Sequence, residues 1–99
     1  MDDYKKQVDD LLELAAQKGG SDLHLSTGYY PTVRIDGRLA PLADRPVLDS
    51  RTVEGMAFSI IDEPRKQRFL AEKEIDFAYE LSQKVRCRVN IYLTRGNYA

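Results

Sequence analysis

The residues best suited to chemistry lie in a strand-like segment, 85–94, called the arginine strand below. Its sequence, VRCRVNIYLT, alternates strictly, so apolar side chains share one face and a polar row with Arg86 and Arg88 shares the other. Two guanidinium groups on a stiff strand can bind an anion, because each offers two parallel donors to carboxylate or phosphate oxygens. They can equally pair with carboxylates of a neighbouring strand.

Carboxylates are available for such pairing. Glu74 and Asp76 share one face of another expected strand, 74–80, which a short polar turn joins to the arginine strand. Their spacing superficially resembles the carboxylate pair of an acid–base catalyst. Cross-strand ion pairs with Arg86 and Arg88 explain both acids without catalysis, and this interpretation is favoured.

A second polar group precedes these strands. Asp22 and His24 alternate with Leu23 and Leu25, so they belong to the polar face of a short strand. An imidazole there can orient a neighbour or change its charge near neutral pH. No nucleophile or second histidine is near in sequence, which favours an interface or structural role for Asp22 and His24. Cys87 lies on the apolar face of the arginine strand and is expected to be a small core residue.

Nucleotide and metal motifs are missing from the sequence. None of the six glycines precedes a lysine, so a phosphate loop of the form G-x-x-x-x-G-K-[ST] is absent. The single histidine and single cysteine are far apart and belong to different strand faces, a poor basis for a metal site. We therefore expect this chain by itself to hold no metal and no cofactor.

Composition bounds the class of protein. The 99 residues are 42% apolar and 31% charged, values typical of one globular domain. Fifteen basic and sixteen acidic side chains give a formal charge of -1, which argues against a nucleic-acid partner. The acidic N-terminus lacks the apolar centre of a signal peptide, and no run approaches the roughly 18 apolar residues of a membrane span. A cytoplasmic protein is the simplest expectation.

The elements that must position these residues follow from periodicity and turn signals. The expected order is helix, three strands, two helices and two strands. The ranges are, in turn, 4–18, 22–26, 33–35, 38–40, 50–61, 64–70, 74–80 and 85–94. This order predicts an α+β fold in which a mainly antiparallel sheet is covered by helices on one face. The polar row of the arginine strand must then face solvent or a partner.

Local signals sharpen several of these expectations. Asp36-Gly37 predicts a tight hairpin turn between the second and third strands. Asp49 or Ser50 is expected to cap the second helix. In the third helix, Phe69 and Leu70 are expected to face the core.

Several motifs occur together in an order that resembles one family. They are SDLHL at 21–25, PTVRIDG at 31–37, EIDF at 74–77, RCRVN at 86–90, and Arg95-Gly96. Together they span essentially the whole chain. In this order and spacing they resemble the N-terminal domain of the PilT twitching-motility ATPases, the motors of type IV pilus retraction.

The resemblance implies that residues 1–99 form a PAS-like domain of a larger, hexameric ATPase of the secretion superfamily. The RecA-like C-terminal domain, which would bind ATP and Mg²⁺, would be absent from this chain, so the fragment alone is not expected to be an enzyme. The homo-oligomer would form through the neighbouring subunit's C-terminal domain. An inner-membrane platform protein would be a further partner, which places the parent at the inner face of the cytoplasmic membrane.

The resemblance also assigns roles to arginines. Arg88 matches the arginine before the Val-Asn of the family motif, which implies contact with the phosphates of ATP bound by a neighbouring subunit. Arg86 and Arg95 match further basic positions of that motif. Arg95 is out of phase with the other two and needs a bulge or strand end to share their site. Apart from the resemblance, cross-strand pairing leads us to expect an ion pair between Arg86 and either Asp76 or Glu80.

The chain departs from the family pattern at three positions. Cys87 replaces a usual phenylalanine, Thr94 a usual glutamine and Tyr30 a common proline. Alternative functions are the same domain of a pilus-assembly or type II secretion ATPase, a stand-alone PAS-like sensor of small molecules, or a module that only docks on the platform protein. For Arg88 the alternative is an ion pair confined to the sheet.

Overall fold

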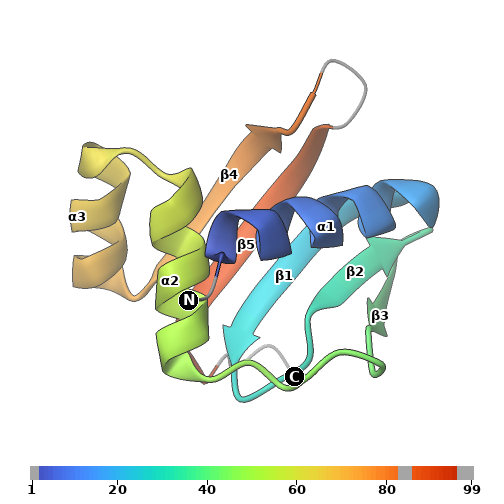
Figure 1. Cartoon of the computed structure of the whole chain (residues 1–99), viewed down its shortest axis with the longest axis horizontal. Coiled ribbons are helices and arrows are strands. Elements are labelled where there is room, and N and C mark those ends of the chain that lie inside the picture. Colours follow the sequence, from blue (N-terminus) through green and yellow to red (C-terminus); the bar gives the residue numbers. More distant parts are fainter. Residues whose placement is uncertain (1–2, 83–85, 96–99) are drawn as a thin grey trace.

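The computed structural model describes residues 3–82 and 86–95, with the side chains of Thr94 and Arg95 outside the description. The elements are α1 (Tyr4–Gln17), β1 (Gly20–Thr27), β2 (Thr32–Ile35), β3 (Arg38–Pro41), α2 (Ser50–Ile60), α3 (Glu63–Glu72), β4 (Glu74–Glu80) and β5 (Arg86–Arg95) (Figure 1). This order confirms the expected succession of helices and strands, and with it the α+β class.

An aspartate begins each helix, because its carboxylate accepts a hydrogen bond from a backbone N–H that the first turn leaves without a helical partner. The pairs are Asp3 with Lys6 at 3.0 Å, Asp49 with Thr52 at 2.8 Å, and Asp62 with Arg65 at 3.1 Å. The cap of the second helix is therefore Asp49 rather than Ser50. Within residues 3–82 and 86–95, no helix has the length and apolar character required to cross a membrane.

The five strands form one sheet in the order β3-β2-β1-β5-β4. Three of the four pairings among the described residues are antiparallel, and the central pairing of β1 with β5 is parallel. The sheet is thus mixed, although mainly antiparallel as expected. A parallel neighbour requires a long crossover, and α2 and α3 lie in that crossover. The arginine strand β5 consequently has a neighbour on each side.

The turn between β2 and β3 has the geometry that its sequence predicts. Asp36 and Gly37 both have positive φ, 50° and 78°. Two consecutive residues of positive φ make the type I′ turn, whose twist matches that of the strands it joins. The Asp-Gly pair therefore fixes the hairpin register, with Ile35 opposite Arg38.

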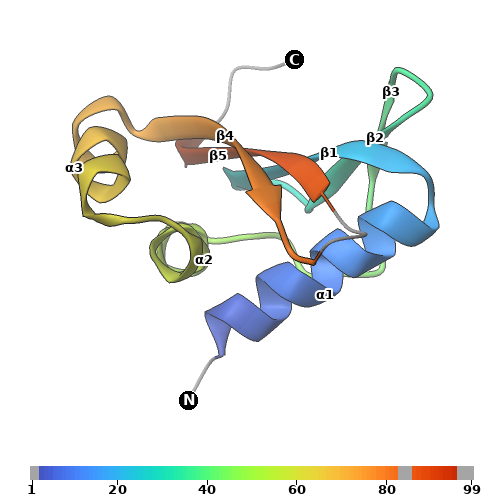
Figure 2. The ribbon, with the colours of Figure 1, turned by 90° about the horizontal axis from the view of Figure 1, so that it is seen from above.

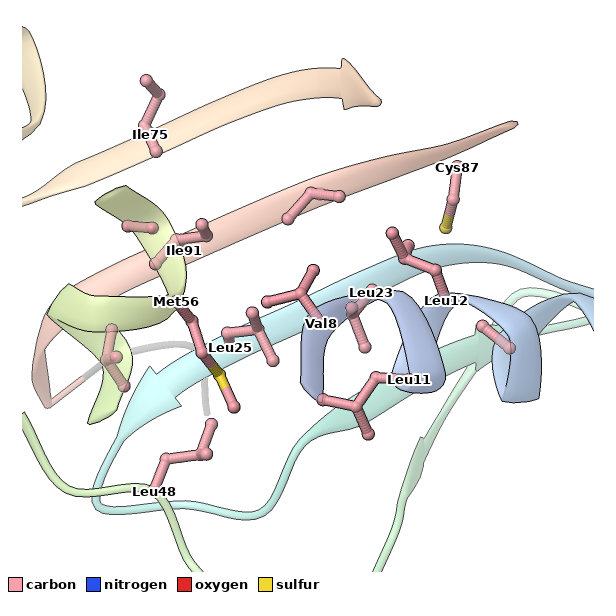
Figure 3. Close-up of a cluster of buried hydrophobic side chains, with 14 of the residues drawn as sticks. Val8, Leu11, Leu12, Leu23, Leu25, Leu48, Met56, Ile75, Cys87 and Ile91 are labelled. Carbon is pink, nitrogen blue, oxygen red and sulfur yellow. The ribbon is translucent and has the colours of Figure 1, made fainter. Parts of the chain in front are cut away.

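Helices α1 and α2 cover one face of the sheet, and none of the helices among residues 3–82 and 86–95 lies on the other face (Figure 2). The core lies between these layers, where side chains of α1, β1, α2 and β5 meet (Figure 3). Its fully buried members are Val8, Leu12, Ala15, Leu23, Leu25, Val33, Val53, Ala57, Phe69, Val89 and Ile91. The sheet therefore has a covered face and an open face.

Helix α3 lies beside β4 at one end of the sheet rather than over its covered face (Figure 2). Phe69 is fully buried and meets the Phe58 ring edge-on at 6.2 Å, and the Arg65 guanidinium lies 5.4 Å from the centre of the Phe77 ring. The expectation that Leu70 also faces the core is wrong, since it is 40% exposed. A helix at the margin of a sheet buries a narrower stripe than one packed across it.

Candidate functional site

The open face gathers most of the polar residues singled out in the sequence. Its central members are Asp22 and His24 of β1, Arg34 of β2, Asp76 of β4, and Arg88 and Asn90 of β5. In the pairing of β1 with β5, Asp22 lies opposite Arg88 and His24 lies opposite Asn90. Directly opposed residues of paired strands share a face of the sheet. The fold therefore brings Asp22, His24 and Asp76 to Arg88.

Arg88 forms a bidentate ion pair with Asp76. Its Nε donates to Oδ1 at 2.8 Å and its Nη2 donates to Oδ2 at 2.5 Å. Ala78, not Asp76, is directly opposite Arg88, so the guanidinium reaches Asp76 diagonally past a small side chain. Hydrogen bonding by Arg88 lowers the pKa of Asp76, which is therefore ionised at neutral pH. The expected cross-strand ion pair is confirmed for Asp76 with Arg88. The expectation is wrong for Glu74, which lies opposite Tyr92 and forms no ion pair among the described residues.

Charges of opposite sign alternate across four strands of the open face. Arg34 lies opposite Asp22, which lies opposite Arg88, and Arg88 reaches Asp76. Asp76 chiefly raises the pKa of Arg88, and Asp22 adds to the effect. Arg34 is held at its end of the row, because its Nη1 donates to the carbonyl of Gly37 at 3.1 Å. Two positive and two negative side chains leave this row electrically balanced.

His24 and Asn90 occupy the middle of the open face. His24 lies between Thr32 of β2 and Asn90 of β5 in the sheet register. Burial lowers the pKa of His24, and the nearby carboxylate of Asp22 is the main opposing influence, so the ring is neutral at pH 7. Asn90 is only 7% exposed, which corrects the expectation that the whole polar row faces solvent or a partner. Its short side chain lies between His24 of β1 and Asp76 of β4 in the register, whereas the longer side chain of Arg88 reaches solvent.

The other two arginines differ from Arg88. Arg86 is exposed at the start of β5, opposite Glu80. The expectation that Asp76 or Glu80 holds Arg86 is wrong: the described residues contain no such ion pair, and both oxygens of Asp76 bind Arg88. The backbone of Arg95 lies opposite Thr27, whereas Ser26 lies opposite Tyr92, so the irregularity that Arg95 required is present. The side chain of Arg95 is outside the described residues.

Sequence reasoning missed Arg34 as a member of this site. Its alternation with Val33 and Ile35 placed it on a polar strand face. The missing information was that β1 separates β2 from β5, which puts Asp22 between two arginines. Such long-range neighbours are fixed by tertiary packing, and no local pattern reports them.

Cys87 faces the core as expected. It is 5% exposed, and its Sγ donates to the carbonyl of Ser21 at 3.4 Å. Burial raises the pKa of the thiol to about 11, so the unreactive protonated form dominates at neutral pH.

A cavity of about 240 Å³ opens between α1, α2 and the segment 45–48. Its lining includes Tyr4, Leu11, Arg45, Val47, Thr52 and Met56, and none of the described residues that line it belongs to a strand. It therefore differs from the pocket between sheet and helices that a PAS-like sensor would use. Among residues 3–82 and 86–95, no group of three or more His, Cys, Asp or Glu side chains could hold a metal ion.

Two curated proteins of Pseudomonas aeruginosa are similar to the chain in sequence. The type IV pilus retraction ATPase PilT is 33% identical over 85 residues, which are 86% of this chain and 24% of that protein. The type IV pilus ATPase PilU is 29% identical over 90 residues, or 91% of this chain and 23% of that protein. The chain thus spans about a quarter of the length of these relatives. No protein-family model matches it.

Solved structures show the same fold. The pilus retraction motor PilT with bound ADP superposes with a TM-score of 0.70 at 32% identity, over 90% of this chain and 26% of that one. The ATPase DotB of Legionella pneumophila gives 0.66 at 28% identity, over 85% of this chain and 23% of that one. The five-stranded sheet with three helices is compatible with a PAS-like N-terminal domain of PilT.

Proposed function

Since this chain fits the N-terminal domain of a PilT-like ATPase, we propose that it is an assembly and regulatory domain of a hexameric, ATP-hydrolysing motor. The motor powers type IV pilus retraction and twitching motility. In this proposal the domain packs on the C-terminal domain of the neighbouring subunit and supplies Arg88 to the phosphates of the ATP bound there. Arg86 and Arg95 are secondary donors from the same strand.

The placement of Arg88 is the observation that carries the proposal. Its side chain is 62% exposed on the open face of the sheet, while its backbone lies within β5, between β1 and β4. A planar, permanently charged guanidinium on a rigid strand can donate two hydrogen bonds to phosphate oxygens. If this domain supplies the guanidinium to ATP bound by the neighbouring subunit, the position of the domain relative to that subunit depends on the nucleotide bound there.

ATP and Mg²⁺ belong to a C-terminal RecA-like domain in this proposal. The present chain lacks a phosphate loop, and its described residues offer no cluster of metal ligands. In this proposal the chain contributes to the nucleotide site only through the contact made in trans. Alone, the domain is not expected to hydrolyse ATP.

The arginine assignment is tested by Arg88→Ala in the full-length parent. We expect intact hexamers by light scattering and a fall in ATP turnover of roughly tenfold or more, since arginines supplied in trans contribute about 10³ to 10⁵ in rate in other phosphoryl-transfer enzymes. Arg68→Ala is the matched control, because it removes an exposed arginine whose ion-pair partner, Glu72, lies on the same helix, α3. Unchanged turnover in Arg88→Ala would contradict the assignment.

The remaining parts of the proposal concern location and partners. The motor acts in the cytoplasm, peripheral to the inner face of the cytoplasmic membrane, where it contacts the platform protein of the pilus machine. Co-purification of the full-length parent with that platform protein, compared with the parent lacking residues 1–99, tests whether this domain contributes to the contact. Equal recovery would restrict the domain to contacts between subunits.

A second candidate is the same domain in a pilus-assembly or type II secretion ATPase, and the likeness to the ATPase DotB indicates that this domain is not confined to PilT. Restoration of twitching in a strain that lacks its retraction ATPase distinguishes the two. The retraction motor is expected to restore motility when supplied with its own platform protein, and another secretion ATPase is not.

A further inference from the structure

We infer that Asp76 is a restraint on Arg88, which holds the guanidinium on the domain's own sheet until an anion takes the carboxylate's place. The inference rests on the proposed function and adds regulation to the same site. Its consequence is that the arginine is not constantly available to a neighbouring phosphate. Engagement of the Nε/Nη2 edge requires an exchange of partners on the open face.

The first support is the hydrogen-bonding edge that Asp76 occupies. The Nε and Nη2 groups of Arg88 point along one edge of the guanidinium plane, and both donate to Asp76. That edge is one of the two on which a guanidinium binds two oxygens of a phosphate in the bidentate manner. A phosphate at this edge must therefore displace the carboxylate.

The second support is the electrostatic balance of the row. Arg88 lies between Asp22 of β1 and Asp76 of β4, so two carboxylates lie close to its single positive charge. A phosphate group brought to Arg88 in this position would be repelled by both. Movement of the guanidinium away from the sheet removes the repulsion and exposes its full charge.

The third support is the difference in mobility between the two partners. Asp76 has a short side chain on a strand whose register with β5 is fixed by pairing on either side of it, Ile75 with Ile91 and Phe77 with Val89. Arg88 has a long side chain that is 62% exposed, so its outward rotation meets solvent rather than protein. The arginine is thus the part that moves. Asp76, at 42% side-chain exposure, is hydrated once the arginine leaves.

If Asp76 orients Arg88 instead of restraining it, removal of the carboxylate has the opposite effect on nucleotide binding. If the carboxylate orients Arg88 for the phosphate, its removal weakens nucleotide binding or slows turnover. If it restrains Arg88, its removal makes nucleotide binding tighter. The two roles are separated by the sign of the change in KM for ATP.

The test is Asp76→Asn in the full-length parent, which keeps the side-chain shape and removes the charge. Exposed ion pairs are weak, so we expect KM for ATP to fall about two- to fivefold with kcat nearly unchanged. Glu74→Gln is the matched control, because Glu74 lies two residues away on the same strand and forms no ion pair among the described residues. The fall should vanish when Asp76→Asn is combined with Arg88→Ala. An unchanged or higher KM overturns the restraint.

A second measurement separates this inference from the proposed function. Inorganic triphosphate is titrated into the 99-residue chain while the Nε–H resonance of Arg88 is followed by NMR, and Asp76→Asn is expected to bind about two- to fivefold more tightly. Equal binding by both forms overturns the restraint. If Arg88→Ala leaves ATP turnover in the parent unchanged while triphosphate still binds more tightly to Asp76→Asn, the proposed function fails and the restraint stands.

Discussion

The two faces of strand β5 differ in almost every physical respect although they share one backbone. Cys87, Val89 and Ile91 point into the core and are 5%, 0% and 0% exposed, whereas the side chain of Arg88 lies on the open face and is 62% exposed. Alternation within a single strand thus separates the side chains that hold the fold together from one that can act on a partner. Substitutions on the covered face should therefore change stability, and those on the open face should change binding.

The largest effect is expected for Ile91→Ala. The side chain is fully buried against the helices, so its truncation should lower the free energy of unfolding by about 2–5 kcal/mol. Urea denaturation followed by circular dichroism measures it. Leu39→Ala is the control on the open side, because Leu39 is 44% exposed and opposite Arg34, and should change stability by only about 0.5 kcal/mol. Equal losses of unfolding free energy in Ile91→Ala and Leu39→Ala would contradict the proposed difference between the covered and the open face.

A smaller effect is expected where α1 leads into β1. A Cβ added to Gly20 would lie 2.3 Å from Cγ1 of Val33 and 3.1 Å from the carbonyl oxygen of Ala15. Gly20→Ala should therefore destabilise the domain by about 1–3 kcal/mol through overpacking. Thermal unfolding measures the change, with exposed Ser21→Ala as the neighbouring control. A neutral Gly20→Ala would mean that the covered face is looser at this corner than the contacts indicate.

Burial of Cys87 on the covered face should make the stability of the domain depend on pH above pH 9. Burial raises the pKa of Cys87 from 9.0 to about 11, so the protonated thiol stabilises the fold fully below pH 9 and this contribution is lost as the pH rises through 11. The difference in unfolding free energy between the wild type and Cys87→Ala should be constant from pH 7 to 9 and then change in favour of the variant. A constant difference throughout would show that the thiol is solvated.

The smallest effect is expected on the open face at low pH. Arg88 lowers the pKa of Asp76 below 3.8, so the stabilisation by the ion pair is present above that pH and is lost as the pH falls through the lowered pKa. The wild type should be slightly more stable than Asp76→Asn at pH 7, and the two should converge in strong acid. Acid titration of both forms tests this, with Glu74→Gln as the neutral comparison. If the stabilities of the wild type and Asp76→Asn already became equal near pH 6, a group other than Asp76 would be responsible for the pH dependence.

Local chemistry was enough to predict the order and type of the elements. The Asp36-Gly37 turn, the Asp49 cap and the buried Cys87 follow from properties of one or a few neighbouring residues, and the structure confirms each. The prediction that Leu70 faces the core was wrong, because helical periodicity does not indicate whether a helix packs across a sheet or lies at its margin.

The candidate site was only partly accessible from sequence. Alternation placed Arg86 and Arg88 on one face, but the choice of partner for Asp76 depended on register. Register is set by turn geometry and by packing over the whole hairpin. Asp76 therefore holds Arg88, two residues farther along β5 than Arg86. The proximity of Asp22 depends on a strand pairing between opposite ends of the chain.

That parallel pairing has a consequence for how the domain is made. The hydroxyl of Thr27 donates to the carbonyl of Leu93 at 2.6 Å, across a sequence separation of 66 residues. The chain loses the entropy of closing this long loop before the stabilising contacts between β1 and β5 can form. Such a long-range pairing therefore slows folding. During synthesis, α1 and the hairpin of β2 and β3 can form early, but β1 has no second neighbour until β5 has been made. Strand β5, which carries Arg88, is thus the last of the five strands to be synthesised. It joins β4 to the part of the sheet formed by β1, β2 and β3.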